Sequence, residues 1–345
     1  MNLRLSWGEN YAPKSVKVKK AIKQTCLEAS KLVHLYPGDL QNKLKKNLAQ
    51  KYHIYPGQIV LGNGLEGIIH LIVRTLVKKG ETLALLSPTF PVAQLVAKTY
   101  GIKVVKIPIQ INEKLVPSKL LLLIKASKAL YLAYPNNPTG QYVITLSGLK
   151  YLLAQYQGIV ILDECYFGIG KLTAIDLLKK HPNLIILRSF SKVYGLAGLR
   201  VGFAIASVSN AKILQKYSKD IEEDQLNVFS CLLAKNTLPF TSHLEQQYLI
   251  FKKDFASYLE KKLKLKVFDT KTSFVLLKLP KKVNANKIVR IINRQYGYLL
   301  KDTSGYDNFA DNILMFTVPP KQEWHKFVYS LKQSIKCMGG GDNYD

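Results

Sequence analysis

The middle of the chain alternates short apolar runs with longer amphipathic segments, and this alternation limits the possible folds. The runs are rich in Ile, Val and Leu on both faces, which is typical of strands buried on both sides. Strands of this kind separated by helices predict an α/β fold, with a mostly parallel sheet covered by helices. The expected strands are Thr82–Leu86, Val104–Ile107, Ala129–Ala133, Ile159–Asp163, Leu184–Arg188 and Val201–Ala206. The expected helices are Gly64–Lys78, Pro91–Thr99, Thr145–Gln155 and Leu172–Lys180.

The pattern changes after residue 243. A long lysine-rich helix at about Leu244–Leu263 is followed by short strands and two further helices, which predicts a smaller α+β domain. The first 40 residues do not fit the sheet, and we expect them to pack with this second domain. The expected division is an N-terminal segment 1–40, a large domain 41–243, a small domain 244–338 and a flexible tail 339–345.

The charge of the chain is unusual, with 50 basic and 23 acidic residues and a formal net charge of +27. Only six of the 50 basic residues are arginines, the type that nucleic-acid readers favour for its bidentate guanidinium. The lysines are scattered along the chain. We therefore expect a solvated lysine-rich surface and no specific nucleic-acid partner, with non-specific attraction to polyanions as the alternative.

The cellular location can be inferred from features that the sequence does not contain. It contains no run of about 18 uncharged apolar residues, so we expect no membrane-spanning helix. The first nine residues have no apolar signal core. Four cysteines lie far apart without the spacing of a metal site or a disulfide framework, so we expect reduced thiols and no metal. These features predict a cytoplasmic protein.

The strongest chemical motif lies at residues 189–202, which read SFSKVYGLAGLRVG. A lysine amine such as that of Lys192 forms a Schiff base with an aldehyde cofactor when its pKa is lowered. Ser189 and Ser191 can hydrogen-bond a phosphate, and Arg200 can clamp it. The alternative is a glycine-rich loop with a surface lysine.

Two polar segments follow neighbouring expected strands. Residues 134–140 read YPNNPTG at a strand's carboxyl end, where open α/β sheets place ligands, and Asn137 can donate to a ring hydroxyl oxygen. Asp163 ends an apolar strand, where a carboxylate needs a cationic partner such as a protonated pyridine nitrogen. Tyr166 can reach the same ring hydroxyl as Asn137. A plain turn and a capping aspartate are the alternatives.

Two weaker motifs come earlier in the chain. Residues 61–67 read LGNGLEG and open the helix expected from Gly64, so that backbone amides at its N-terminus can cradle a phosphate. Phe90, within SPTFP, can stack on a cofactor ring or belong to the core. The five motifs together follow one order: phosphate cradle, stacking aromatic, hydroxyl partner, nitrogen partner and Schiff-base lysine. Chance explains each motif alone but not all five.

With these motifs the sequence resembles the fold-type I pyridoxal-phosphate-dependent aminotransferases of class I/II. The histidinol-phosphate aminotransferase-like branch is the most similar, and the threonine-phosphate decarboxylases are its relatives. The resemblance extends from Glu9 to about Val318 and rests on Asn-Asn-Pro-Thr-Gly and Ser-x-Ser-Lys-x-x-Gly-Leu-Ala-Gly-Leu-Arg. It implies pyridoxal 5'-phosphate as cofactor and a large sheet domain joined to a smaller α+β domain.

The resemblance also implies a role for each residue. Lys192 would hold the cofactor as a Schiff base and move the proton at the reacting carbon. Asp163 would pair with the ring nitrogen, and Phe90 would stack on the ring. Asn137 and Tyr166 would hold the 3'-oxygen. The phosphate would be held by Ser189, Ser191, Arg200 and the backbone amides of Gly64, Leu65 and Glu66.

Further residues follow from the same resemblance. Tyr36, in LYPGD, would reach the cofactor phosphate of a second subunit, which implies a homodimer, and Tyr11 would lie over the substrate. Three places depart from the family, and the first is the cradle, which reads Leu65-Glu66-Gly67 where the family has Ser-Asp-Glu. Met315 stands where a family arginine binds the substrate's carboxylate or phosphate, and Lys301 replaces a second arginine, keeping its charge but not its fork.

The function expected from these observations is amino-group transfer between an amine or amino acid and a 2-oxo acid, through a Schiff base on Lys192. A threonine-phosphate type decarboxylase is an alternative, because the same cofactor site serves both reactions. A protein of this fold with an altered substrate site is another, given Met315. The sequence leaves the substrate pair open.

Overall fold

The computed structural model describes residues 2–220 and 226–339. Its centre is a seven-stranded sheet with the strand order β2-β8-β7-β6-β5-β3-β4. Only β8 runs antiparallel to its neighbours, β7 and β2, and the remaining pairs are parallel. The strands are β2 (Ile59–Asn63), β3 (Thr82–Ser87), β4 (Lys103–Pro108), β5 (Ala129–Ala133), β6 (Ile159–Asp163), β7 (Leu184–Ser189) and β8 (Val201–Ile205). The mostly parallel α/β sheet expected from the sequence is confirmed.

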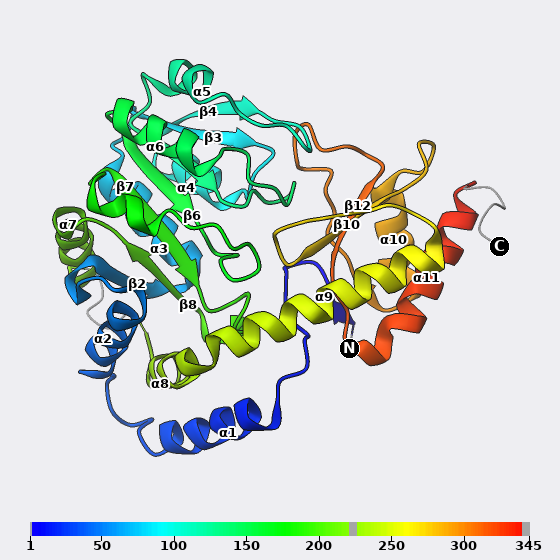
Figure 1. Cartoon of the computed structure of the whole chain (residues 1–345), viewed down its shortest axis with the longest axis horizontal. Helices are drawn as coiled ribbons and strands as arrows, with labels where there is room; N and C mark the ends of the chain where they lie inside the picture. Colours follow the sequence, from blue (N-terminus) through cyan, green and yellow to red (C-terminus); the bar gives the residue numbers. More distant parts are fainter. Residues whose placement is uncertain (1, 221–225, 340–345) are drawn as a thin grey trace.

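Helices cover both faces of this sheet (Figure 1). One apolar cluster joins a sheet face to α3, α4 and α7, and another joins the opposite face to α2, α5 and α6. In β5, residues 129, 131 and 133 belong to the first cluster and residues 130 and 132 to the second, as the two-residue period of a doubly covered strand requires. The helices are α2 (Leu40–Tyr52), α3 (Gly64–Leu76), α4 (Val92–Thr99), α5 (Pro117–Ile124), α6 (Leu146–Gln155), α7 (Val208–Lys219) and α8 (Val228–Thr237).

Side-chain caps fix where several helices begin. Thr145 accepts a hydrogen bond from the backbone NH of Gly148 at the start of α6, and Ser207 and Asn227 do the same for α7 and α8. Each satisfies a backbone donor that the first helical turn leaves free, which stabilises a helix by about 1 kcal/mol. The expected helix Leu172–Lys180 is wrong: the structure has only a short 3₁₀ helix, Ile175–Lys179, between β6 and β7. The preceding segment is occupied instead by Thr173 and Ala174, which hydrogen-bond the Glu164 carboxylate.

The long helix α9 (Thr241–Leu263) runs from the large sheet to a second, smaller unit (Figure 1). That unit contains an antiparallel sheet of order β12-β10-β9 with two helices packed together. Its elements are β9 (Val267–Phe268), β10 (Phe274–Lys278), α10 (Ala285–Gln295), β11 (Tyr298–Leu299), β12 (Ile313–Thr317) and α11 (Trp324–Cys337).

The N-terminal residues contact both units. β1 (Leu3–Arg4) pairs in parallel with β11 of the small unit. α1 (Val16–Ser30) lies apart from the sheet and packs against α8 (Figure 1). The N-terminal segment therefore bridges the two units.

The expected tail, 339–345, lies outside the described residues except for Gly339.

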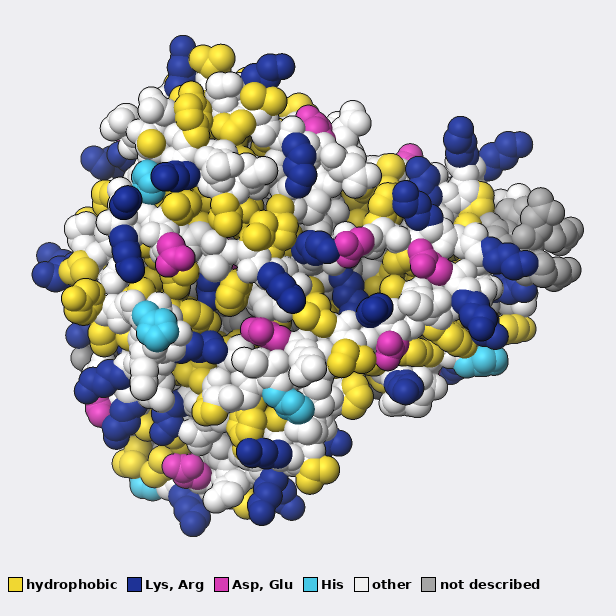
Figure 2. Space-filling view, viewed as in Figure 1, with side chains coloured by type: hydrophobic (Ala, Val, Ile, Leu, Met, Phe, Trp, Pro, Cys, Tyr) yellow, Lys and Arg dark blue, Asp and Glu magenta, His cyan; other side chains and the backbone are white. Residues whose placement is uncertain are grey.

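Basic side chains are spread over both units on the face in Figure 2 and do not gather into one patch. This agrees with the scattered lysines of the sequence. None of the helices within residues 2–220 and 226–339 has the length and apolar character needed to cross a bilayer. Over the same residues, no group of three or more His, Cys, Asp or Glu side chains could hold a metal ion.

Candidate active site

Six of the predicted site residues lie at the carboxyl ends of β5, β6 and β7. Asn137 follows β5, Asp163 is the last residue of β6, and Lys192 follows β7 by three residues. Because these strands are adjacent and parallel, their ends lie on one edge of the sheet. This is where open α/β sheets bind ligands.

Lys192 lies beneath the N-terminal segment. Its Nζ donates hydrogen bonds to the backbone oxygens of Trp7, at 2.6 Å, and Gly8, at 3.4 Å. The Asn10 amide donates to the backbone oxygens of Lys192 and Val193, at 3.0 and 2.9 Å, which fixes the loop that carries the lysine. Burial lowers the pKa of Lys192, partly opposed by Cys165, Glu9 and Asp163. A lowered pKa favours the neutral amine that attacks a carbonyl carbon.

Asp163 is a buried carboxylate, 3% exposed. The Tyr131 hydroxyl donates to its Oδ2 at 2.5 Å, and the backbone NH of Cys165 donates to its Oδ1 at 2.9 Å. Burial raises its pKa, whereas these hydrogen bonds and the charge of Lys192 lower it. No ion pair of Asp163 is formed within the described part of the chain. A buried acid held by neutral donors is suited to a cationic ligand atom.

Asn137 and Tyr166 lie beside Asp163 at the same edge. The Asn137 Nδ2 donates to the Tyr166 hydroxyl at 3.2 Å. The Asn137 Oδ1 is buried and has no hydrogen-bond partner among the residues that the structure describes. The Lys192 Nζ lies 5.6 Å from the centre of the Tyr166 ring. A buried polar atom without a protein partner fits a place where a polar ligand binds.

The residues expected to form the phosphate cradle lie where β2 ends and α3 begins. One of the expected amides is not free, because the Gly64 NH donates to the Arg200 backbone oxygen at 2.7 Å. Gly64 has φ +69°, and a Cβ there would lie 2.5 Å from the Arg200 Nη2, so a side chain would be strained and would displace the guanidinium. The guanidinium therefore lies against the first turn of α3, where it pairs with the Glu66 carboxylate at 3.2 Å. Both partners are about half exposed, so an anion can compete for Arg200.

Ser189, Ser191 and Phe90 complete the predicted set on this edge. The Ser189 hydroxyl accepts a hydrogen bond from the Ser191 NH at 3.0 Å. Phe90 is partly buried in the loop after β3. Asn136 holds that loop by donating to the Pro88 oxygen and accepting from the Thr89 hydroxyl, each at 3.0 Å. Sequence reasoning assigned no role to Asn136, although its place beside Asn137 in YPNNPTG was a signal.

A second acid, Glu164, lies next to Asp163 but is fully satisfied internally. The Arg188 Nη2 lies 2.8 Å from its Oε2, and both side chains are buried. The Thr173 hydroxyl and the Ala174 NH also donate to the carboxylate. The Arg188 guanidinium lies 3.7 Å from the centre of the Phe167 ring. This network fixes the ends of β6 and β7 and leaves Glu164 unavailable to a ligand.

The remaining residues predicted from the resemblance make no hydrogen bond, ion pair or ring contact with Lys192, Asp163 or Asn137 in the part of the chain that the structure describes. Tyr36 is 91% exposed in the turn between α1 and α2, and no hydrogen bond or ring contact joins it to the other site residues within the described ranges. Lys301 has its Nζ 5.7 Å from the Tyr306 ring centre. Met315 is 1% exposed on β12, opposite Leu276 of β10. An apolar side chain thus occupies the position at which the resemblance placed an arginine.

The N-terminal segment contributes more than sequence reasoning found. The Arg4 Nε donates to the Glu9 carboxylate at 2.6 Å, and the Arg4 guanidinium lies 4.8 Å from the Trp7 ring centre. The Tyr11 hydroxyl donates to the Arg4 backbone oxygen at 2.7 Å. Glu9 and Asn10 precede Tyr11 in the segment that carried the resemblance, which was the available signal.

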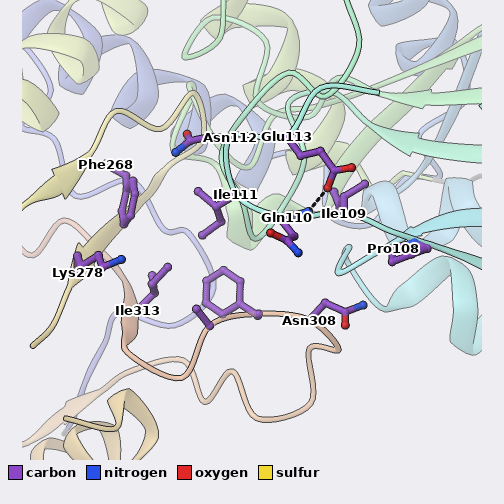
Figure 3. A pocket seen from close by; sticks show the side chains of 12 residues that line it. Pro108, Ile109, Gln110, Ile111, Asn112, Glu113, Phe268, Lys278, Asn308 and Ile313 are labelled. Carbon is purple, nitrogen blue, oxygen red and sulfur yellow. Dashed lines mark hydrogen bonds between the residues drawn. The ribbon is translucent and has the colours of Figure 1, made fainter. Parts of the chain in front are cut away.

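A pocket of about 650 Å³ lies between the loop after β4 and the loop before β12 (Figure 3). Ile111, Phe268 and Phe309 supply apolar walls, while Lys278 supplies a charge. The backbone NH of Gln110 donates to the Glu113 carboxylate at 2.7 Å. None of the predicted site residues lines this pocket, so we do not assign it to the reaction.

The whole site fits pyridoxal phosphate. The unpartnered Asn137 Oδ1, the buried Asp163 acid and the close packing of Arg200 on Gly64 leave a polar, an anionic and a cationic group on one sheet edge. These groups match a ring oxygen, a protonated ring nitrogen and a phosphate, and Lys192 provides the amine for the aldehyde.

Residues 2–307 match the family model for aminotransferases of class I and II. The match covers most of the chain, so the chain belongs to this family. The resemblance expected from the motifs is confirmed, as is pyridoxal 5'-phosphate as cofactor. The chain is a pyridoxal-phosphate-dependent aminotransferase of fold type I.

Relatives within this family carry a more specific name. A histidinol-phosphate aminotransferase of Thermoanaerobacter pseudethanolicus is 34% identical over 313 residues, which is 89% of this chain and 86% of the relative. Histidinol-phosphate aminotransferase 2 of Haemophilus influenzae (strain KW20) is 29% identical over 97% of this chain and 90% of its own length.

Solved structures share the fold at lower identity. The histidinol-phosphate aminotransferase of Sinorhizobium meliloti, in complex with pyridoxal-5'-phosphate, superposes with a TM-score of 0.85 at 21% identity and covers 98% of this chain and 92% of its own. The L-threonine-O-3-phosphate decarboxylase of Porphyromonas gingivalis has a TM-score of 0.77 at 20% identity, with 97% and 99% covered. One fold thus accommodates both reactions that the sequence left open.

Proposed function

We propose that this aminotransferase acts on histidinol phosphate, or a closely similar phosphorylated amine, and passes the amino group to a 2-oxo acid. The observation that carries the proposal is a lysine of lowered pKa beside a buried acid at one sheet edge, in a chain whose relatives bear that activity.

The residues on this edge would divide the work of holding the cofactor. Asp163 would face the ring nitrogen, Asn137 and Tyr166 the 3'-oxygen, and Phe90 the face of the ring. Arg200 would exchange Glu66 for the phosphate, which is a stronger partner because it carries more charge and more acceptor oxygens. Further phosphate contacts would come from Ser189, Ser191 and the backbone amides of Leu65 and Glu66, since the Gly64 NH is already bonded to the Arg200 oxygen.

Lys192 would move the proton of the reaction. When bound, pyridoxal phosphate supplies an electron-withdrawing ring that stabilises negative charge on the substrate carbon next to nitrogen. Lys192, with its pKa lowered by burial, can take a proton from that carbon and deliver it to the cofactor carbon that comes from the aldehyde. The Asn10 amide would hold the lysine loop in place during this transfer.

The anionic group of the substrate needs a cation, and Met315 cannot supply one. Lys301 would serve, with Tyr11 covering the substrate. Arg4 lies on the strand beside the Lys301 segment, and its Nη atoms make no hydrogen bond within the described residues, so it is a second source of charge.

We also propose a homodimer in the cytoplasm. Apolar side chains around Tyr36 are exposed, including Leu27, Val33 and Leu35. An exposed apolar group of this kind is typical of a protein interface. It would let Tyr36 reach the phosphate site of a second subunit. The division into segment 1–40, domains 41–243 and 244–338, and a tail belongs to the same proposal.

The test is a coupled assay on the cofactor-loaded protein. Histidinol phosphate and 2-oxoglutarate are added, and glutamate and carbon dioxide are both measured. We expect glutamate without carbon dioxide, and no glutamate from Lys192→Ala, which lacks the reacting amine. Threonine phosphate is the competing substrate: carbon dioxide from it, with no glutamate in the first assay, would establish the decarboxylase instead. Full activity of Lys192→Ala would contradict the mechanism.

A further inference from the structure

The further inference concerns Tyr131, a residue of β5 that no motif singled out. Tyr131 is fully buried, and its ring belongs to the apolar cluster under α3 and α4. It lies two residues before Ala133, the residue that pairs with Asp163 on β6. Residues two apart in a strand share a face, so the tyrosine points to the same side of the sheet as Ala133.

The Tyr131 hydroxyl is the closest hydrogen-bond donor to the Asp163 carboxylate. It lies 2.5 Å from Oδ2, compared with 2.9 Å from the Cys165 NH to Oδ1. Burial and the charge of Asp163 raise the pKa of Tyr131 well above its ordinary value. The phenol therefore keeps its proton, and the direction of the hydrogen bond is fixed from tyrosine to carboxylate.

A neutral donor serves Asp163 in a way that a cation could not. The adjacent acid, Glu164, is neutralised by the Arg188 guanidinium. Tyr131 instead orients Asp163 and favours its ionised form while leaving the negative charge uncancelled. A carboxylate accepts about four hydrogen bonds, so the two present leave capacity for a further donor.

We propose that Tyr131 is a positioning residue that holds the Asp163 carboxylate ionised and aimed at the cofactor's ring nitrogen. The inference rests on the proposed role of Asp163. It adds a residue that touches neither substrate nor cofactor and acts only through that carboxylate. Removing the hydroxyl would raise the pKa of Asp163, because burial would then be opposed by fewer hydrogen bonds.

The test variant is Tyr131→Phe, which removes one oxygen and keeps the ring. The dissociation constant of pyridoxal phosphate is measured by equilibrium dialysis from pH 5 to pH 8, together with the absorbance of the bound cofactor. A hydrogen bond to a charged group contributes about 1.5–3 kcal/mol, so we expect the dissociation constant to rise about 10- to 100-fold at neutral pH. The pH below which binding weakens should move upward. For turnover, we expect kcat to fall while KM for the amine is unchanged.

Tyr156→Phe is the matched control. Tyr156 is also a buried tyrosine of the large unit, 3% exposed, and its hydroxyl donates to the Ser127 backbone oxygen at 2.8 Å, away from Asp163. It should leave the dissociation constant and its pH dependence unchanged. If Tyr131→Phe behaves like this control, the inference is wrong and Tyr131 only fills space.

The Asp163→Asn background separates the inference from the proposed function. If Asp163→Asn impairs cofactor binding or turnover, adding Tyr131→Phe to it should cause little further loss, because both act through one carboxylate. An additive loss would overturn the inference alone. If Asp163→Asn has no effect, the role of Asp163 itself fails. Should Tyr131→Phe not fold, Tyr131→Gln retains a neutral donor: a pH profile like the wild type supports the inference, and impairment equal to that of Asp163→Asn contradicts it.

Discussion

The sheet edge that carries Lys192 and the strands on the other side of the N-terminal segment are built differently. On the sheet edge, polar side chains are buried and held by other side chains, as in the Asp163 and Glu164 networks. On the other side, β1 and Leu5 are joined to β11 and β12 by backbone hydrogen bonds, such as that from the Thr317 NH to the Leu5 oxygen. Its charged side chains, including Arg4 and Lys301, are exposed or only partly buried.

This difference corresponds to cofactor binding on one side and substrate binding on the other. Substitutions in a buried side-chain network lower stability or binding, because each deletion leaves a partner without its hydrogen bond. A surface held by backbone bonds tolerates changes of side chain, since the strand pairing does not depend on them. The cofactor edge therefore carries the motif residues Asn137, Asp163 and Lys192, whereas the substrate side carries Met315 where the resemblance places an arginine. The predictions below test this separation from the largest expected effect to the smallest.

Asp163→Asn should lower kcat by about 10²–10³-fold, the usual loss when one electrostatic partner of the reacting group is removed. The fold should be kept, because the amide still accepts from Tyr131 and the buried charge is gone. Steady-state kinetics with thermal unfolding checks both points. A variant that loses its fold as readily as its activity would mean that the acid is structural.

Glu164→Gln should lower stability and leave kcat largely unchanged, the reverse of Asp163→Asn. It leaves the Arg188 charge buried without its carboxylate, which costs about 3–5 kcal/mol of unfolding free energy. Enzyme that remains folded should retain most of its kcat, since the Glu164 carboxylate is occupied internally. Urea unfolding and active-site titration of the folded fraction make the measurement. Equal stability to the wild type would remove the distinction between the two acids.

Lys301→Ala tests the substrate side. We expect KM for a phosphorylated amine to rise about tenfold or more with little change in kcat, because a charged hydrogen bond made equally in the ground and transition states is lost. Lys281→Ala, at an exposed lysine of the same unit, is the control and should change neither constant. An unchanged KM for Lys301→Ala would leave Arg4 as the candidate cation.

Lys252 of α9 provides a pH test of the small unit. Its Nζ donates to the backbone oxygens of Thr270 and Thr272, at 2.6 Å each, and burial lowers its pKa to about 7. The folded state thus releases this proton more readily than the unfolded state, so stability should rise between about pH 7 and pH 10. The slope is at most about 1.4 kcal/mol per pH unit.

The measurement compares urea unfolding of the wild type and Lys252→Met across that range. The variant should lack the rise, whereas Lys253→Met, at the exposed neighbour, should keep it. Activity should change little with either variant, because Lys252 supports the small unit and not the cofactor edge. Parallel pH profiles for the wild type and Lys252→Met would show that the ammonium stays charged when folded.

The sequence predicted much of the sheet and much of the cofactor edge for a physical reason. Strands such as Ala129–Ala133 and Ile159–Asp163 are apolar on both faces, and their bounds match the structure. The motif residues follow those strands directly, so topology alone brings them together. Asn136, Tyr131 and Glu164 were not found, because their roles depend on partners 24 to 48 residues away in sequence.

The substrate side was harder to predict because long-range pairing builds it. The pairing of β1 with β11 places Arg4 and its partner Glu9 near the Lys301 segment, and the sequence did not show this pairing. The 3₁₀ helix Ile175–Lys179 was expected to be longer because local propensity does not record that the preceding residues bind Glu164. Met315 lies in β12, and its burial against Leu276 depends on the pairing of β10 with β12.

The pairing of β1 with β11 also sets an order of events when the chain is made. Leu3 and Arg4 leave the ribosome well before their partners Tyr298 and Leu299, which are translated almost 300 residues later. The large unit can fold while synthesis continues, since domains generally fold as units from the N-terminus. The segment that supplies the Trp7 and Gly8 oxygens to Lys192 can take its final place only after β11 has been translated. The cofactor edge can thus fold before this segment covers the lysine.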